Sequence, residues 1–264
     1  MFSYPVPRRD RDRSPPRFPL ILGHRGASAL QLENTTQAFE QAIRDGADGV
    51  ELDVQRCQTG EIFVFHDESL ARLAGRSERL VDLSGPVIRE IRLPGGHPIP
   101  TLAEALEACG PSATVNIELK FGAGFLLNPA ALIEGVAHEL RRTKAFSRVW
   151  VSSFNPRAVW EWRRRYSHSA FLFERLQRGT FPWPGQPAWL TRFLRPFAVH
   201  PESALCTTRS VAAWRRLGLQ INTWTVDDPV ELRRVLALGV DGIIANDPGK
   251  ARRVLALTPR STDA

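Results

Sequence analysis

Three carboxylates stand at positions where they could share one ion. Glu51 and Asp53 lie two residues apart in the β-like run GVELDV, so both side chains point to the same face of an expected strand. Glu118 holds the equivalent place in the run TVNIEL. Carboxylates that converge inside a fold repel one another and are costly to remove from water. A bound divalent cation offsets that cost, and an all-oxygen ligand set favours Mg²⁺ or Ca²⁺ over zinc.

Two histidines and two cationic residues accompany these carboxylates. His24 and His66 each follow an apolar run, and histidine exchanges protons near neutral pH because its ordinary pKa is about 6.5. Arg25 and Lys120 stand beside the same groups. This combination suits the cleavage of a phosphodiester. The cations would stabilise the phosphoryl oxygens, and the histidines would move protons to and from the attacking and leaving oxygens.

Short β-like runs alternate with amphipathic stretches along most of the chain. The runs interpreted as strands are 19–24, 49–54, 62–66, 114–119, 148–153, 170–174, 197–200, 221–226 and 242–246. The stretches interpreted as helices are 35–45, 102–108, 129–144, 156–165, 209–217, 229–238 and 249–257. Asn34, Asn155 and Asp228 stand where helix N-caps are expected, and a proline follows each of the last two.

Strand–helix alternation over one core predicts parallel strands joined by right-handed crossovers. Roughly eight units in about 250 residues is the size of a (β/α)8 TIM-type barrel, which we expect over residues 18–258 as a single domain. A doubly wound sheet is the alternative, but the first strand leads into GHRGAS and not into a GxGxxG fingerprint. A (β/α)8 barrel has eight strands, so the nine β-like runs are one more than the barrel requires. Either 49–57 and 61–66 form an irregular hairpin, or one late run lies outside the barrel.

The composition is that of an ordinary folded protein, with 43% hydrophobic and 24% charged residues among 264. No apolar run approaches the roughly 18 residues that a membrane helix needs. Cys57, Cys109 and Cys206 are odd in number and far apart, which argues against a disulfide framework or a zinc cluster. Residues 1–17 are expected to form a flexible basic tail and not a secretory signal, and 259–264 a C-terminal tail. A cytoplasmic location is the expectation.

The net charge of +7 raises the alternative of a basic nucleic-acid-binding protein. Only Lys120, Lys144 and Lys250 are lysines among the 35 cationic residues. The arginines beyond the tail are interspersed with acids, as in IREIR. This pattern favours general surface charge over a nucleic-acid interface, so no nucleic-acid partner is expected.

Eight motifs follow one another in a familiar order. They are HRGASALQLENTTQAFEQAI, GADGVELDV, FVFHDESLARLAG, IPTLAEAL, NIELK, VSSFNP, INTWTVDD and GVDGIIANDP. From about Leu20 to Pro248 the chain thereby resembles the glycerophosphodiester phosphodiesterase family. The resemblance implies a TIM-type barrel that uses a divalent cation to hydrolyse deacylated phospholipid head groups, its small-molecule substrates, to glycerol 3-phosphate and an alcohol.

The resemblance also implies roles for particular residues. The metal ligands would be Glu51, Asp53 and Glu118, and the phosphate contacts would be Arg25 and Lys120. The general acid and base would be His24 and His66, and Trp224 would form a wall against the glycerol or the head group. Two departures leave the head-group preference open. Leu32 stands where the family often has proline, and LARLAGRSE lacks the family's Arg-Thr-Thr.

Other readings remain. The aromatic segment 179–197 suggests a phosphodiesterase of the lysophospholipase D or sphingomyelinase D kind. This segment is a lid, a lipid-facing patch or a loop packed on its own barrel. A catalytically inactive barrel is disfavoured by the full polar set. Glu174 and His200 end strand-like runs and are further candidates for the rim. Three other histidines, His97, His138 and His168, are interpreted as structural.

Overall fold

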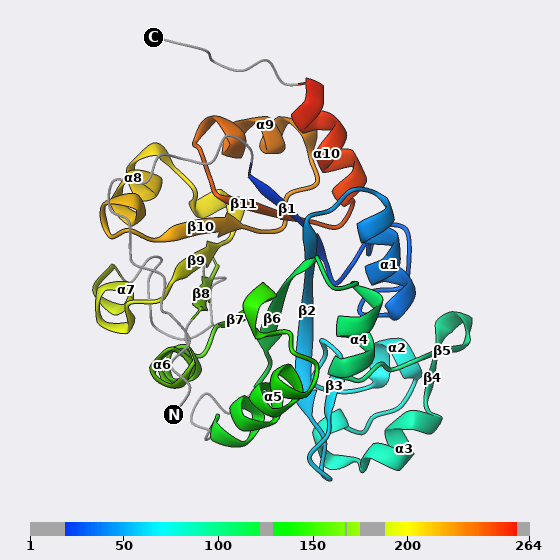
Figure 1. Ribbon diagram of the computed structural model, residues 1–264. Coiled ribbons are helices and arrows are strands. Elements are labelled where there is room, and N and C mark those ends of the chain that lie inside the picture. The colour runs from blue at the N-terminus through cyan, green and yellow to red at the C-terminus, as the bar shows by residue number, and fades with distance from the viewer. Residues whose placement is uncertain (1–18, 122–128, 167, 175–187, 258–264) are drawn as a thin grey trace.

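The computed structural model describes residues 19–121, 129–166, 168–174 and 188–257, and its strands form a ring surrounded by helices (Figure 1). Eight parallel strands pair in the order β1-β2-β6-β7-β8-β9-β10-β11, and β11 pairs with β1 to close the barrel. They are β1 (Leu20–His24), β2 (Gly49–Arg56), β6 (Thr114–Leu119), β7 (Val149–Ser153), β8 (Ser169–Phe173), β9 (Ala198–Pro201), β10 (Gln220–Thr223) and β11 (Gly242–Ala245). The predicted (β/α)8 TIM-type barrel is confirmed. The two predicted tails lie outside the described residues.

Helices follow the barrel strands and cover them from outside (Figure 1). They are α1 (Thr36–Arg44), α4 (Leu102–Ala108), α5 (Ala130–Arg142), α6 (Pro156–Arg165), α7 (Ala188–Leu194), α8 (Thr208–Arg216), α9 (Pro229–Ala237) and α10 (Pro248–Leu257), with short 3₁₀ turns η3 (Phe146–Arg148) and η4 (Ser203–Leu205).

The N-caps of three helices test the sequence predictions. The side chains of Asn155 and Asp228 each accept two backbone N–H groups at the start of α6 and α9, as predicted. The prediction for Asn34 is wrong, because Thr35 caps α1 and accepts from the N–H of Ala38. Asn34 instead adopts a left-handed φ of 57°, and its side chain turns to the site described below.

Successive side chains of β2 point alternately to the outer apolar core and to the interior of the barrel, where the candidate site lies. Val50, Leu52 and Val54 are fully buried in the apolar layer between strands and helices. Glu51 and Asp53, on the opposite face, are equally buried but face the interior of the barrel. Inside the barrel Leu22, Trp150 and Ile244 form a small apolar cluster. The strand therefore anchors two carboxylates through its packed outer face.

The ninth β-like run is β3 (Ile62–Val64), which pairs antiparallel with β2 and forms the hairpin expected as one of two alternatives. It opens an appended unit, residues 57–101, which lies to one side of the barrel (Figure 1). The unit contains α2 (Ala71–Ala74), η1 (Leu80–Asp82), α3 (Gly85–Glu90), β4 (Arg92–Leu93), η2 (Pro94–Gly96) and β5 (His97–Pro98). Its own apolar core consists of Cys57, Phe63, Phe65, Leu70, Leu80, Ile88, Ile91, Leu93 and Ile99.

Other sequence predictions concern the cysteines, the aromatic segment and the absence of a membrane helix. The three cysteines are buried and free, as the argument against disulfides requires. Residues 179–187 of the aromatic segment lie outside the described part of the chain. The remainder includes α7, from which Phe193 is 69% exposed. Within the described ranges, no helix has the length and apolar character needed to cross a bilayer.

Candidate active site

A cavity of about 360 Å³ collects nearly all the predicted site residues. Seven of the eight line it, and Asp53 lies behind them in contact with Arg25 and Lys120. The lining residues are His24, Arg25, Glu51, His66, Asn116, Glu118, Lys120, Phe154, Leu172, Glu174, Trp224 and Ile244. They come mostly from the carboxyl ends of the barrel strands, where a barrel of this type places its site.

The three carboxylates converge as their spacing predicted. Asp53 and Glu118 are register partners across β2 and β6, and Glu51 precedes them on the same face. One oxygen from each lies within 4.8 Å of the others, and all three side chains are buried. Burial, together with the charges of Asp53 and Glu118, raises the pKa of Glu51 well above its ordinary value. Such a set of close, buried oxygens has the composition that a hard divalent cation binds.

Two cations partly compensate this charge. Lys120 Nζ lies 2.9 Å from Glu118 Oε1 and 3.6 Å from Asp53 Oδ1, and the Arg25 guanidinium lies 3.3 Å from Asp53 Oδ2. Burial alone would raise the pKa of Asp53, but Lys120 and Arg25 outweigh it and the pKa is lowered. For Glu118 burial outweighs Lys120, and the pKa is raised. Two basic groups therefore hold the site together without neutralising all three acids.

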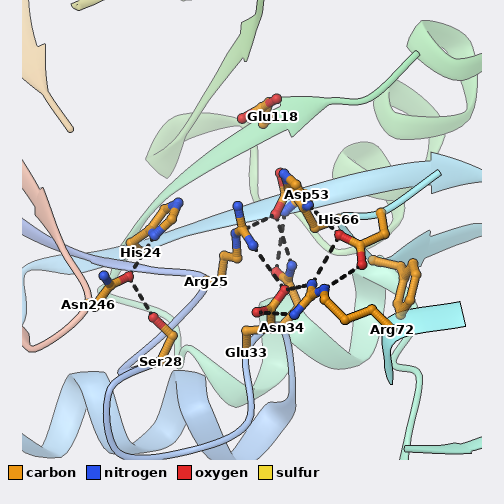
Figure 2. Close-up of polar contacts among 12 residues, drawn as sticks. His24, Arg25, Ser28, Glu33, Asn34, Asp53, His66, Arg72, Glu118 and Asn246 are labelled. Carbon is orange, nitrogen blue, oxygen red and sulfur yellow. Dashed lines mark hydrogen bonds and ion pairs between the residues drawn. The ribbon is translucent and has the colours of Figure 1, made fainter. Parts of the chain in front are cut away.

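Arg25 and Asn34 reach the carboxylates from the loop after β1. Arg25 has a left-handed φ of 55°, and its backbone N–H donates to Glu51 Oε2 at 3.0 Å. Asn34 Nδ2 donates to Asp53 Oδ2 at 2.9 Å (Figure 2). Non-glycine residues seldom adopt this backbone region, and such conformations concentrate at functional sites. The loop is thus shaped so that it supplies donors to two of the three acids.

His24 is held by an amide. Its Nδ1 lies 2.7 Å from Asn246 Oδ1, which also accepts from the Ser28 hydroxyl (Figure 2). Asn246 Nδ2 donates to Asp227 at 2.6 Å, which fixes the orientation of the amide. Because an amide oxygen only accepts, Nδ1 is assigned the proton and Nε2 the lone pair. Burial, followed by the charge of Arg25, lowers the pKa of His24.

His66 is held by a carboxylate. Its Nδ1 lies 2.7 Å from Asp67 Oδ1, and Arg72 Nε donates to Asp67 Oδ2 at 2.6 Å. The hydrogen bond from Arg72 lowers the pKa of Asp67 to about 2. Burial lowers the pKa of His66 despite the attraction of Asp53. Both histidines therefore occupy the same cavity with different partners at Nδ1.

The opposite wall of the cavity is aromatic and apolar. The rings of Phe154 and Trp224 meet edge to face, 5.7 Å between centroids and at 88°. Trp224 Nε1 donates to the carbonyl oxygen of His200 at 2.8 Å, which fixes the indole. Leu172 extends the wall, and Glu174 is exposed at its edge. Glu174 forms no ion pair with any residue that the structure describes.

His200 does not line this cavity, unlike Glu174. It is fully buried, and its Nε2 lies 2.9 Å from Asn222 Nδ2. Burial lowers the pKa of His200 to about 3, so the ring is neutral at ordinary pH. Of the two additional rim candidates, only Glu174 belongs to the site. His168, at the start of β8, packs against Phe197 and away from it.

Several residues of the site were not predicted from the sequence. Asn246 follows a strand, so the rule that selected His24 and His66 would have found it. Asp67 adjoins His66 in sequence but received no role. Glu33 and Arg72 are far apart in the chain and meet only in the fold, so no spacing signal marks them.

Comparisons with known proteins agree with this geometry. A sequence model of the glycerophosphoryl diester phosphodiesterase family matches residues 24–250. The glycerophosphodiester phosphodiesterase of Caldanaerobacter subterraneus subsp. tengcongensis is 30% identical over 235 residues, which cover 85% of this chain and 93% of the relative. The probable glycerophosphodiester phosphodiesterase 2 of Mycobacterium tuberculosis is 30% identical over 236 residues, 85% of this chain and 86% of that protein.

Solved structures share the barrel. The glycerophosphodiester phosphodiesterase of Thermotoga maritima aligns with a TM-score of 0.73 at 28% identity, covering 90% of this chain and 99% of that one. A phosphodiesterase of Oleispira antarctica, solved with the product sn-glycerol-3-phosphate, aligns with a TM-score of 0.80 at 20% identity, covering 90% and 97%. With a family match over most of its length, this chain belongs to the glycerophosphoryl diester phosphodiesterase family.

Proposed function

We propose that this protein hydrolyses glycerophosphodiesters to glycerol 3-phosphate and an alcohol. The observation that carries the proposal is one cavity that contains three converging carboxylates, two flanking cations and two histidines. The names of the relatives support the same reaction, and the Oleispira phosphodiesterase was solved with glycerol 3-phosphate as its product.

Glu51, Asp53 and Glu118 would hold one divalent cation, Mg²⁺ or Ca²⁺. The raised pKa values of Glu51 and Glu118 express mutual repulsion and burial that such an ion relieves. When bound, the ion supplies Lewis-acid stabilisation of charge on the phosphoryl oxygens. Arg25 and Lys120, within 4 Å of Asp53, add positive charge at the same place and orient the phosphate.

The two histidines move the protons. One accepts the proton of the attacking hydroxyl, which belongs either to water or to the glycerol 2-hydroxyl. Attack by the 2-hydroxyl would give a cyclic phosphate, which water would then open to glycerol 3-phosphate in a second step. As the bond from phosphorus to the leaving oxygen breaks, the other histidine donates a proton to that oxygen. Burial lowers the pKa of both rings and so favours their neutral forms, whereas an anionic substrate would favour protonation of one of them.

The alternatives find less support. Residues 179–187 of the aromatic segment that suggested a lysophospholipase D lie outside the described residues. Many arginines of the described chain pair with neighbouring acids, among them Arg76 with Glu78 and Arg234 with Glu231. Each such pair reduces the positive charge that these arginines could offer to a nucleic-acid backbone.

The decisive experiment measures glycerol 3-phosphate release from a panel of glycerophosphodiesters, with lysophosphatidylcholine and single-stranded DNA alongside. We expect turnover of the deacylated substrates, its loss in EDTA and its restoration by Mg²⁺ or Ca²⁺. Activity indifferent to chelator would contradict the metal site. Faster turnover of lysophosphatidylcholine would favour the lysophospholipase D alternative, and salt-sensitive DNA binding without turnover would favour nucleic-acid binding.

A further inference from the structure

We propose that Arg72 is a positioning residue of this site: it joins Asp67 to Glu33 and thereby fixes His66 and Arg25 relative to one another. The inference rests on the proposed roles of His66 and Arg25. Arg72 does not line the cavity and has no part in the reaction described above.

One side of the guanidinium holds the carboxylate beside His66. Arg72 lies on α2, one turn of helix in the appended unit shortly after His66. Its Nε donates to Asp67 Oδ2 at 2.6 Å and its Nη2 to Asp67 Oδ1 at 3.0 Å. Asp67 Oδ1 is also the partner of His66 Nδ1. Two parallel hydrogen bonds prevent the carboxylate from turning, and the imidazole keeps its partner.

The other side reaches the loop after β1, 39 residues away in sequence. Arg72 Nη1 donates to Glu33 Oε2 at 3.0 Å and Nη2 to Glu33 Oε1 at 2.6 Å. Glu33 Oε1 accepts in addition from Arg25 Nη1 at 2.9 Å (Figure 2). A continuous series of hydrogen bonds therefore runs from His66 through Asp67, Arg72 and Glu33 to Arg25.

Arginine alone has the geometry for this position. All three guanidinium nitrogens of Arg72 are used, in two bidentate contacts with two carboxylates. A lysine ammonium is a single centre on a flexible stem and cannot bind both carboxylates in this way. Without Arg72, His66 would be the remaining partner of Asp67 and Arg25 that of Glu33, and Glu33 would draw Arg25 away from Asp53.

The exposure of Arg72 decides what kind of effect to expect. Its side chain is 48% exposed, and ion pairs in contact with water add little to stability. Removal of Arg72 should therefore leave the melting temperature nearly unchanged and act on the geometry of the site. A control lies in the same unit, because Arg76 makes a similar contact with Glu78, at 2.6 Å, without any connection to the cavity.

The test compares Arg72→Ala, Arg72→Lys and the control Arg76→Ala as full-length, metal-loaded enzymes on glycerophosphocholine. We expect kcat/KM to fall about 10- to 100-fold in Arg72→Ala, as is common when a residue that supports a functional ligand is lost, less in Arg72→Lys, and not at all in Arg76→Ala. Variants at the two ends of the hydrogen-bond series should affect different kinetic constants. Asp67→Asn should lower kcat, whereas Glu33→Gln should raise KM and the inhibition constant of glycerol 3-phosphate.

A second measurement does not depend on activity. ¹⁵N-resolved imidazole spectra report the tautomer of His66, and we expect Arg72→Ala to change the His66 signals while those of His138 stay in place. A folded Arg72→Ala enzyme with wild-type kcat/KM and unchanged His66 signals would overturn the inference. If the wild type hydrolyses no phosphodiester but the His66 signals still depend on Arg72, the proposed function fails and the structural link stands. If Arg72→Ala does not fold, Arg72→Lys carries both measurements.

Discussion

The two walls of the cavity are built on opposite principles. The first, from β1, β2, β3 and β6, gathers acids, bases and histidines, and nearly every charged group has a partner within 4 Å. The second, from the later strands, presents the perpendicular rings of Phe154 and Trp224 beside apolar side chains and one carboxylate, Glu174. The difference suggests a division of labour. In the proposed reaction the first wall would perform the chemistry at phosphorus, and the second would bound the rest of the substrate.

The largest effect should come from Glu51→Gln in the first wall. We expect kcat/KM to fall by about 10³-fold or more, since several kcal/mol of metal-based stabilisation is lost. The amide also removes a buried acid from beside Asp53 and Glu118, so the melting temperature in EDTA should stay equal or rise. Kinetics and calorimetry on Glu51→Gln, with the exposed Glu107→Gln as control, check both signs. A large fall in the melting temperature as well as in kcat/KM would indicate that Glu51 stabilises the fold and is not mainly a metal ligand.

The histidines of the first wall should come next, with losses of about 10²- to 10⁴-fold for His24→Gln and His66→Gln. Asp67 offers a protonated His66 a negative charge at Nδ1, whereas the Asn246 amide offers His24 a hydrogen bond that raises its pKa but no charge. We therefore expect His66 to be the acid. A p-nitrophenyl ester needs little protonation of its leaving group, so it should restore His66→Gln much more than His24→Gln. The reverse pattern would exchange the two roles.

His200 is buried behind the second wall and does not line the cavity, so its replacement should affect stability and leave turnover unchanged. Its pKa is about 3 in the folded protein and about 6.5 when unfolded, so the unfolded chain binds a proton first as the pH falls. The free energy of unfolding should decrease from about pH 6.5 to pH 3, by a few kcal/mol at most at 1.36 kcal/mol for each pKa unit. Denaturant melts of wild type and His200→Gln should differ in this slope. An equal pH dependence of the free energy of unfolding in the two proteins would contradict this role of His200.

The smallest effect should be a change in preference at Glu174. An exposed carboxylate beside two aromatic rings attracts a cationic head group, by cation–π contact and by a screened charge. We expect Glu174→Gln to lower kcat/KM about two- to five-fold for glycerophosphocholine, as for an exposed ion pair of up to 1 kcal/mol. Glycerophosphoglycerol should be unaffected. Equal changes for both substrates would remove Glu174 from head-group selection.

The sequence predicted what depends on local pattern. Alternation along a strand placed Glu51, Asp53 and Glu118 on one inner face, and strand ends placed His24 and His66 at the rim. No pattern of spacing in the sequence indicated the contacts between distant segments. Glu33 and Arg72 pair because an appended unit docks beside a loop, and neither residue has a periodic position.

Asn34 shows how two functions of one residue type can be confused. Asparagine is a good N-cap, and the position one residue before the expected helix favoured that interpretation. In the structure Thr35 takes the cap, and Asn34 uses its tolerance of a left-handed backbone to reach Asp53. Sequence spacing alone does not separate a cap from a donor that crosses to a strand.

The appended unit has a consequence for how activity responds to temperature. It has an apolar core of its own, although Ile62 and Val64 of β3 pack into the core of the barrel. The unit carries His66, Asp67 and Arg72, whereas His24 and the three carboxylates belong to the barrel side. Segments with their own cores open by sub-global unfolding at a lower free energy than the whole domain. Opening of residues 57–101 would separate His66, the second proton carrier of the proposed reaction, from the three carboxylates. The active fraction is then governed by the docking equilibrium of this unit, and amide exchange should be faster there than in β1 or β6.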